Sequence, residues 1–265
     1  MPCRITFANH GIGEGMETFS IGRVFSRTFQ LMRDSLSTAG LYVLAISVLE
    51  FAVITGTALA LGGSLSTGIE DQIWGEWLIG LLAYSLAWAG GIHGMLQIAF
   101  HGATSLQECL RVGLGKVFPL TVFLVLWGLA LMFGYVLFVI PMLMMLAAWA
   151  VAVPAMVGEN LSIMDAFGRS RDLTRGYRLQ IFAVLFALLL VMALVWGIGT
   201  PAVRNLSGAD NATGESPAAL FAGALMLLVG WLIGMLNKAT LASLYVETFL
   251  VKEGSPTGQL SEVFG

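Results

Sequence analysis

The sequence predicts an all-α polytopic membrane protein with six transmembrane helices, arranged as three repeats of an interfacial helix followed by a transmembrane hairpin. Composition is the first reason: 57% of the 265 residues are hydrophobic and 32 more are glycine, whereas only 11% are charged. The second reason is that the apolar residues form long uncharged runs, and the third is that the basic residues gather between alternate runs. So few charges and a net charge of −3 exclude soluble, disordered and nucleic-acid-binding chains.

Six apolar runs are long enough to be considered as spans, because crossing ~30 Å of hydrocarbon takes about 20 helical residues. They cover Thr38–Leu61, Trp77–Phe100, Val117–Val139, Met142–Gly158, Leu179–Thr200 and Ala218–Asn237. The third and fourth share one uncharged run, which Pro141 divides, because proline disfavours helical geometry in the preceding residue. The fourth run is short and contains Pro154, so a re-entrant segment is the alternative there.

The lysines and arginines predict the orientation of these spans. Twelve of the 13 lie on one side of the predicted spans, and Arg204 alone lies on the other. Basic residues mark the cytoplasmic side, so we expect both termini in the cytoplasm. Residues 1–18 and 252–265 are then short cytoplasmic tails around a membrane domain at 19–251, and residues 1–17 lack the pattern of a signal peptide.

A basic amphipathic helix is predicted before the first span, at Phe19–Leu36, and Ser162–Arg175 repeats its pattern at an offset of 142 residues. The matching pairs include Ser20/Ser162, Phe25/Phe167, Arg27/Arg169 and Arg33/Arg175. A fainter copy begins at Ser105, and each serine can cap the helix that follows it. The repeat units are about 19–100, 105–158 and 162–250. We expect the three helices to lie in the interface, where arginines meet anionic headgroups.

Part of the sequence resembles a known family. Ala152-Val153-Pro154 with Val157 and Glu159, followed by the series Ala166-Phe167-Gly168-Arg169-Ser170-Arg171-Asp172-Leu173-Thr174-Arg175-Gly176, is similar to the membrane domain of glycerophosphoryl diester phosphodiesterases and to YciC-type inner-membrane proteins of bacteria. Weaker similarity includes Leu244-Tyr245-Val246-Glu247. The resemblance implies a multi-pass protein of the bacterial cytoplasmic (inner) membrane. It implies no catalytic residue, because the phosphodiesterase chemistry resides in a separate soluble barrel that is not expected within these residues.

Three ionisable residues inside the spans are candidates for an intramembrane polar site: Glu50, His93 and Lys238. A carboxylate near the middle of a span costs ~2.5–3.5 kcal/mol on insertion scales, so Glu50 is expected to face the bundle interior or to be protonated. Pairing with His93 or Lys238 would make a proton relay or a substrate site. The alternative is a structural interhelical contact, with Lys238 extending to the interface.

Other motifs indicate packing or surface contact. Gly90–Gly94 and Gly230–Gly234 each contain GxxxG, which permits close approach of helices. Four arginines near the second basic helix are candidates for contact with anionic lipid: Arg169, Arg171, Arg175 and Arg178. Cys3 and Cys109 are expected to stay reduced, and the three dispersed histidines predict no metal site and no cofactor.

These features favour a non-enzymatic protein that organises lipids or scaffolds a membrane partner, either another membrane protein or a second copy of this chain. The first alternative is a small transporter or channel that uses Glu50 and His93. A membrane-embedded lipid enzyme is the third reading, although it would need paired ionisable groups at headgroup depth, and the sequence shows no such pair.

Overall fold

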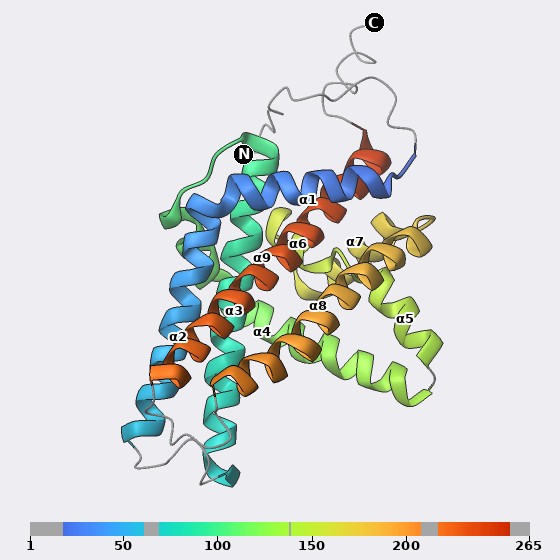
Figure 1. Cartoon of the computed structure of the whole chain (residues 1–265). Coiled ribbons are helices and arrows are strands. Elements are labelled where there is room, and N and C mark those ends of the chain that lie inside the picture. Colours follow the sequence, from blue (N-terminus) through green and yellow to red (C-terminus); the bar gives the residue numbers. More distant parts are fainter. Residues whose placement is uncertain (1–17, 61–68, 138, 208–216, 255–265) are drawn as a thin grey trace, which may run out of the picture.

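The computed structural model describes residues 18–60, 69–137, 139–207 and 217–254, and every regular element in these ranges is helical (Figure 1). The all-α prediction is therefore confirmed. The α-helices are α1 (Ile21–Ser35), α2 (Leu41–Ala60), α3 (Ile69–His101), α4 (Leu106–Leu137), α5 (Val139–Ala148), α6 (Ala152–Gly158), α7 (Ile163–Thr174), α8 (Arg178–Ser207) and α9 (Pro217–Glu253). A five-residue π-helix, η1 (Leu36–Gly40), joins α1 to α2.

Five helical segments of the described residues are long and apolar enough to cross a membrane. They are Ile21–Val53, Leu78–His101, Leu106–Val136, Arg178–Gly199 and Ala224–Glu253. Large apolar side chains such as Phe118, Phe133 and Leu179 are exposed on these helices, as expected for surfaces that face lipid tails rather than water. The chain therefore has the architecture of a multi-pass membrane protein.

The predicted fourth span, Met142–Gly158, is not one helix. It is divided into α5 and α6 by a turn at residues 149–151, and the ten residues of α5 rise only ~15 Å, about half of the hydrocarbon core. Pro141 and Pro154 each lie in the first turn of one of these helices, where proline is tolerated because the N–H groups have no partner within the helix. The expectation of six continuous spans is not confirmed.

At one end of the bundle α1, α7 and the last turns of α9 meet. We call it the basic end, because these segments carry arginine and lysine residues. In Figure 1, α1 runs across this end, and η1 turns the chain into α2. Aromatic and cationic contacts join the three segments: Phe19 stacks on Tyr177 with ring centroids 5.6 Å apart, and the Lys252 ammonium lies 5.9 Å from the Tyr177 ring.

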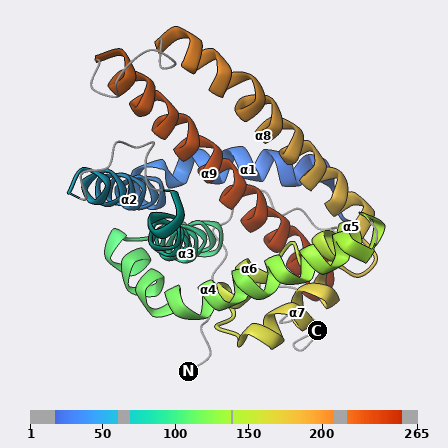
Figure 2. The same cartoon turned by 90° about the horizontal axis from the view of Figure 1, so that it is seen from below.

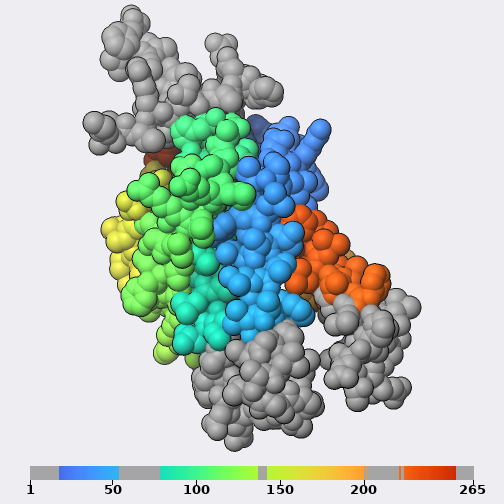
Figure 3. Space-filling view, turned by 90° about the vertical axis from the view of Figure 1, so that its left-hand side faces the viewer, coloured from blue at the N-terminus to red at the C-terminus, as the bar shows by residue number. Residues whose placement is uncertain are grey.

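The core of the molecule surrounds α3, in which 56% of the spanning window is buried, against 17–33% in the other four. Figure 2 shows α9 running between α8 and the α2–α3 pair, and in Figure 3 α2 and α4 cover most of α3 on one face. At the basic end α6 is the most enclosed element, with residues 152–157 all buried. It packs against α3, α7 and α9.

The two GxxxG motifs differ in what they contact. A Cβ on Gly90 would lie 2.5 Å from the Cys109 carbonyl oxygen and from the Tyr42 ring, so α3 needs glycine there. A Cβ on Gly230 would meet only Trp196, at 3.8 Å, which is an ordinary contact. Close approach of helices is thus confirmed at the first motif, whereas the described residues show only an ordinary contact at the second.

The threefold repeat is not confirmed. The outer copies form separate helices, α1 and α7, but the middle copy is the first part of the continuous helix α4. Ser105 and Ser162 accept backbone N–H groups three residues later, at 3.2 and 3.4 Å, and so cap their helices as predicted. Ser20 has no such side-chain bond; its backbone N–H donates to Glu247 instead.

Candidate functional site

A network of charged and polar side chains joins α6, α7 and α9 at the basic end. Arg169 donates from Nε to both carboxylate oxygens of Glu159 at 2.9 Å, and its terminal nitrogen lies 2.5 Å from Glu253. The Tyr245 hydroxyl donates to Glu159 at 2.8 Å. All four residues are partly or fully buried, so the network differs from ion pairs on the fully exposed surface.

Local backbone structure positions the two residues of this network that come from the resemblance motif. Glu159 is the C-cap of α6, and the chain then turns through Asn160, whose φ of 55° is the left-handed conformation that asparagine tolerates. Ser162 caps α7 directly afterwards, which brings Arg169, two turns into α7, back over Glu159. The nine residues between them form a tight reversal that aligns guanidinium and carboxylate.

The surroundings of Arg169 favour the charged form of its guanidinium. Burial by itself lowers the pKa of the Arg169 guanidinium, but the hydrogen bonds that it donates to Glu159 and Glu253 and their negative charges together outweigh burial, so the net shift of the pKa is upward. The guanidinium also lies 6.0 Å from the centroid of the Phe249 ring, which adds a weak cation–π contact.

Next to this network is a cavity of about 350 Å³. One wall is α3, which contributes His93, Gln97 and His101 at four-residue intervals and therefore on one face of the helix. The opposite wall is the charged network. The full lining is His93, Leu96, Gln97, Phe100, His101, Gly158, Glu159, Arg169, Tyr245, Phe249 and Glu253. The cavity thus has two carboxylates and a guanidinium on one side, and the side chains of Gln97 and two histidines on the other.

Two further residues of the motif support this end of the molecule. The buried hydroxyls of Ser170 and Thr174 donate to the Ala148 carbonyl oxygen at 2.9 and 3.2 Å, so α7 satisfies the last carbonyl group of the short helix α5. The motif therefore also holds α7 against the end of α5, besides its contribution to the cavity.

A second charged cluster fixes α1 to α9. Glu247 is fully buried, and it accepts hydrogen bonds from Arg23 Nε at 2.8 Å, from Arg27 at 3.1 Å and from the Ser20 backbone N–H at 3.1 Å. Sequence reasoning assigned the two arginines to lipid headgroups and noted Glu247 only within the resemblance. The available signal was an acidic residue in the otherwise uncharged stretch between Lys238 and Lys252.

The predicted intramembrane pairs are not formed. Glu50 lies against Gly80 of α3, whereas Lys238 packs on Gly91 of the same helix. His93 lies two residues after Gly91. At 1.5 Å per residue, 11 to 13 residues of α3 correspond to roughly 16–20 Å. His93 instead faces Glu108 of α4 at 3.5 Å, and Lys238 is buried, with its ammonium donating to the Gly234 carbonyl oxygen at 3.3 Å. The expectation that Lys238 extends to the interface is wrong.

The four predicted lipid-contacting arginines separate into different environments. Arg169 is occupied by the network, Arg171 and Arg175 are exposed, and Arg178 is half-buried with its Nε atom lacking a hydrogen-bond partner among the described residues. Within the same residues, no group of three histidine, cysteine, aspartate or glutamate side chains is placed to hold a metal ion. Cys109 is buried, and Cys3 lies outside the described residues.

Comparison with protein-family models, with curated proteins and with solved structures found no match. The similarity to the phosphodiesterase membrane domain stays a prediction from the motif residues, and what the chain does must be argued from its own geometry.

Proposed function

We propose that this chain is a non-enzymatic, lipid-interacting protein of a bacterial cytoplasmic membrane, and that the cavity at its basic end receives the headgroup of a zwitterionic phospholipid. The observation that carries the proposal is the lining of that cavity, which offers groups of opposite character on facing walls. A headgroup with an ammonium and a phosphate has the same two characters, and it lies at the depth of the ends of the helices.

Charge favours a headgroup with a cation. Two carboxylates and one guanidinium give the cavity a net charge of −1 when its histidines are neutral. The carboxylate surplus attracts a compact ammonium, whereas the N–H donors of Gln97 and the histidines on α3 suit phosphate oxygens. A headgroup that is anionic overall would add repulsion.

The proposal includes an orientation in which both termini and the basic end face the cytoplasm, supported by the bias of the basic residues. It also includes a fourth crossing made jointly by α5 and α6, because α4 begins beside His101 and the chain returns to the same end for α7. A broken helix is tolerated at this depth where its free backbone groups are buried in protein, and Ser170 and Thr174 supply such partners.

The exposed arginines of α7 keep a separate role in this proposal. Arg171 and Arg175 face outward at the basic end, where each is worth ~1 kcal/mol near an anionic surface. They would hold α7 against anionic headgroups without selecting one lipid, whereas the cavity provides the selectivity.

Native mass spectrometry of the purified protein, titrated with phosphatidylethanolamine or phosphatidylglycerol of identical chains, tests the cavity. We expect wild type to retain phosphatidylethanolamine preferentially. Glu253→Gln removes one carboxylate at the open side of the network and should weaken that preference about fivefold, the scale of a partly exposed ion pair.

Arg171→Gln is the matched control, because it changes a charge on the same surface outside the cavity lining. It should leave retention of phosphatidylethanolamine unchanged and lower that of phosphatidylglycerol, so the preference for phosphatidylethanolamine is not weakened. Equal retention of the two lipids by wild type, or an unchanged preference in Glu253→Gln, would contradict the proposal.

A further inference from the structure

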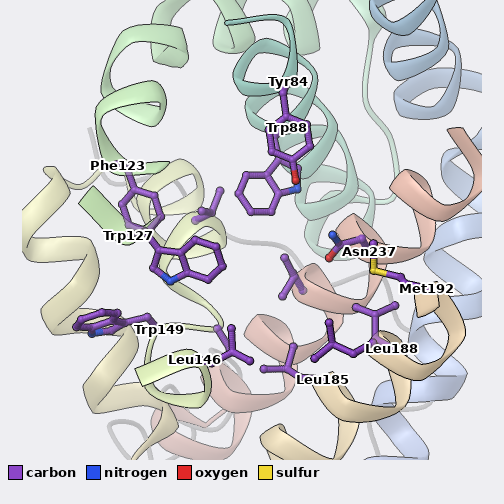
Figure 4. A pocket seen from close by; sticks show the side chains of 14 residues that line it. Tyr84, Trp88, Phe123, Trp127, Leu146, Trp149, Leu185, Leu188, Met192 and Asn237 are labelled. Carbon is purple, nitrogen blue, oxygen red and sulfur yellow. The ribbon is translucent and has the colours of Figure 1, made fainter. Parts of the chain in front are cut away.

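A second cavity, of about 170 Å³, lies between α3, α4, α8 and α9, away from the headgroup site (Figure 4). Five of its fourteen lining residues are aromatic, and its most informative residues are Tyr84, Trp88, Phe123, Trp127, Trp149 and Asn237. Leucines of α8 close the remaining side. Its volume is close to the ~150 Å³ of an engineered cavity that accommodates one benzene molecule.

Two hydrogen-bond donors at this cavity have no acceptor among the described residues. The indole nitrogens of Trp88 and Trp127 are both buried and unpartnered, and Trp88 is only 6% exposed. A buried donor without an acceptor is costly, and buried tryptophan N–H groups ordinarily find one. Both residues line the cavity, so an occupant that carries acceptor oxygens is the kind of ligand that would satisfy them.

The aromatic walls are held in place before anything binds. Phe167 of α7 stacks on Phe123 with centroids 4.5 Å apart and meets Trp149 edge-on at 4.9 Å, from behind the cavity. Tyr84 and Trp88 lie 5.3 Å apart on the α3 side. Such preorganised aromatic faces favour a flat ring, which can stack on them, over a flexible chain.

The cavity opens toward the surface that faces lipid. Tyr84 and Leu189 on its rim are 44% and 48% exposed, while Phe123 and Leu185 are buried behind them. Leu185 and Leu188 lie seven and ten residues from Arg178 at the basic end of α8, which is roughly 10–15 Å along the helix. That depth is within the hydrocarbon, below the ester groups of phospholipids.

From these observations we infer that the aromatic cavity binds the ring of a lipophilic quinone, a flat ring with carbonyl oxygens that enters from the bilayer. The carbonyl oxygens accept hydrogen bonds from the Trp88 and Trp127 indoles, and the hydrophobic tail leaves past Tyr84 and Leu189. Lipid tails gain little by leaving the bilayer for another apolar site, so the acceptor oxygens and the flat ring provide the selectivity. This inference is independent of the headgroup proposal.

The test uses the full chain in detergent micelles and a benzoquinone with one decyl substituent, with decylbenzene and a diacyl phospholipid as the other ligands. Retained ligand is quantified after size-exclusion chromatography across a range of ligand-to-detergent ratios. Wild type should bind the quinone saturably, at one per chain, and should bind decylbenzene at least about tenfold more weakly, because two hydrogen bonds are lost.

The double variant W88F/W127F removes both indole N–H groups and keeps aromatic rings, and it should weaken quinone binding about tenfold or more. W196F is the matched control: it makes the same change on α8, at a residue 41% exposed and outside the lining, and should bind as wild type does. L189W alters only the exposed rim, so it tests entry without disturbing the buried walls, and it should also reduce binding.

Equal binding of quinone and decylbenzene would overturn the inference, because the cavity would then be a site for any apolar chain. Displacement of the quinone by the phospholipid at equal mole fraction would assign the cavity to lipid tails. Quinone binding that survives both W88F/W127F and L189W would place the ligand elsewhere on the protein.

Discussion

Glu247 shows how much one buried charge can organise in this protein. Its carboxylate has no exposed surface, and it satisfies two arginines and a backbone N–H on α1. Arg23 and Arg27 are themselves 39% and 22% exposed, so their desolvation cost is smaller than that of a fully buried pair. The carboxylate therefore stabilises the docking of α1 on α9.

Glu247→Ala should lower the free energy of unfolding by about 2–3 kcal/mol, because it leaves several donors unpaired at once. Titration with SDS in mixed micelles measures this change. Glu247→Gln keeps one acceptor oxygen and should cost less. Asp172→Ala, at an exposed position of α7, is the control and should be nearly neutral. A loss of stability as large as that of Glu247→Ala would show that surface charge is responsible, and not the contact of Glu247 with α1.

The sequence identified the residues of both charged clusters only in part. Arg169 and Glu159 stood out in the resemblance motif, and Arg23 and Arg27 stood out as a basic face, but their partners on α9 did not. The reason is physical: these pairs join residues up to 224 positions apart, and neither periodicity nor local charge patterning reports such distant partners. The unpartnered indoles of Trp88 and Trp127 are equally invisible, since only three-dimensional packing shows a missing acceptor.

Helix α3 depends on glycine where it crosses α2 and α4. Gly90→Ala gains helix propensity of up to ~1 kcal/mol, but its Cβ would meet the Cys109 carbonyl oxygen and the Tyr42 ring at 2.5 Å. We expect a net destabilisation of about 1–3 kcal/mol, as for other overpacked interiors. Thermal unfolding in detergent measures it.

Gly230→Ala provides the opposite case, in the second GxxxG motif. Its new Cβ would lie 3.8 Å from Trp196, so only the gain in helix propensity remains, and the variant should be neutral or more stable. If Gly90→Ala and Gly230→Ala shift the melting temperature in the same direction, the close approach at Gly90 is not what limits the packing of α3.

At this scale the spans themselves were predictable, because the thickness of the hydrocarbon fixes the length of an apolar run. The break inside Met142–Gly158 was signalled by Pro141 and Pro154, yet the sequence could not tell a re-entrant segment from a broken span. That choice depends on whether other helices satisfy the freed carbonyl groups, as Ser170 and Thr174 do for Ala148. The middle repeat failed as a separate helix because α4 continues through it without a break.

The orientation of the whole molecule can be tested with single cysteines in a Cys3→Ser background. Cys109 is buried and should stay silent toward an impermeant thiol reagent. Ser66→Cys, in the predicted outer loop, should react in intact cells, whereas Arg171→Cys should react only after the membrane is permeabilised. Labelling of Arg171→Cys in intact cells, without labelling of Ser66→Cys, would reverse the orientation.

The contact of Glu247 on α9 with Arg23 and Arg27 on α1 has a consequence for biosynthesis. Arg23 and Arg27 are synthesised first, but the carboxylate that receives them is made more than 200 residues later. Until then Arg23 and Arg27 lack this acceptor, and α1 can pack only on earlier segments such as α3. Translation that stops before residue 247 would leave both arginines without this carboxylate, so the docking of α1 on α9 is completed only late in synthesis.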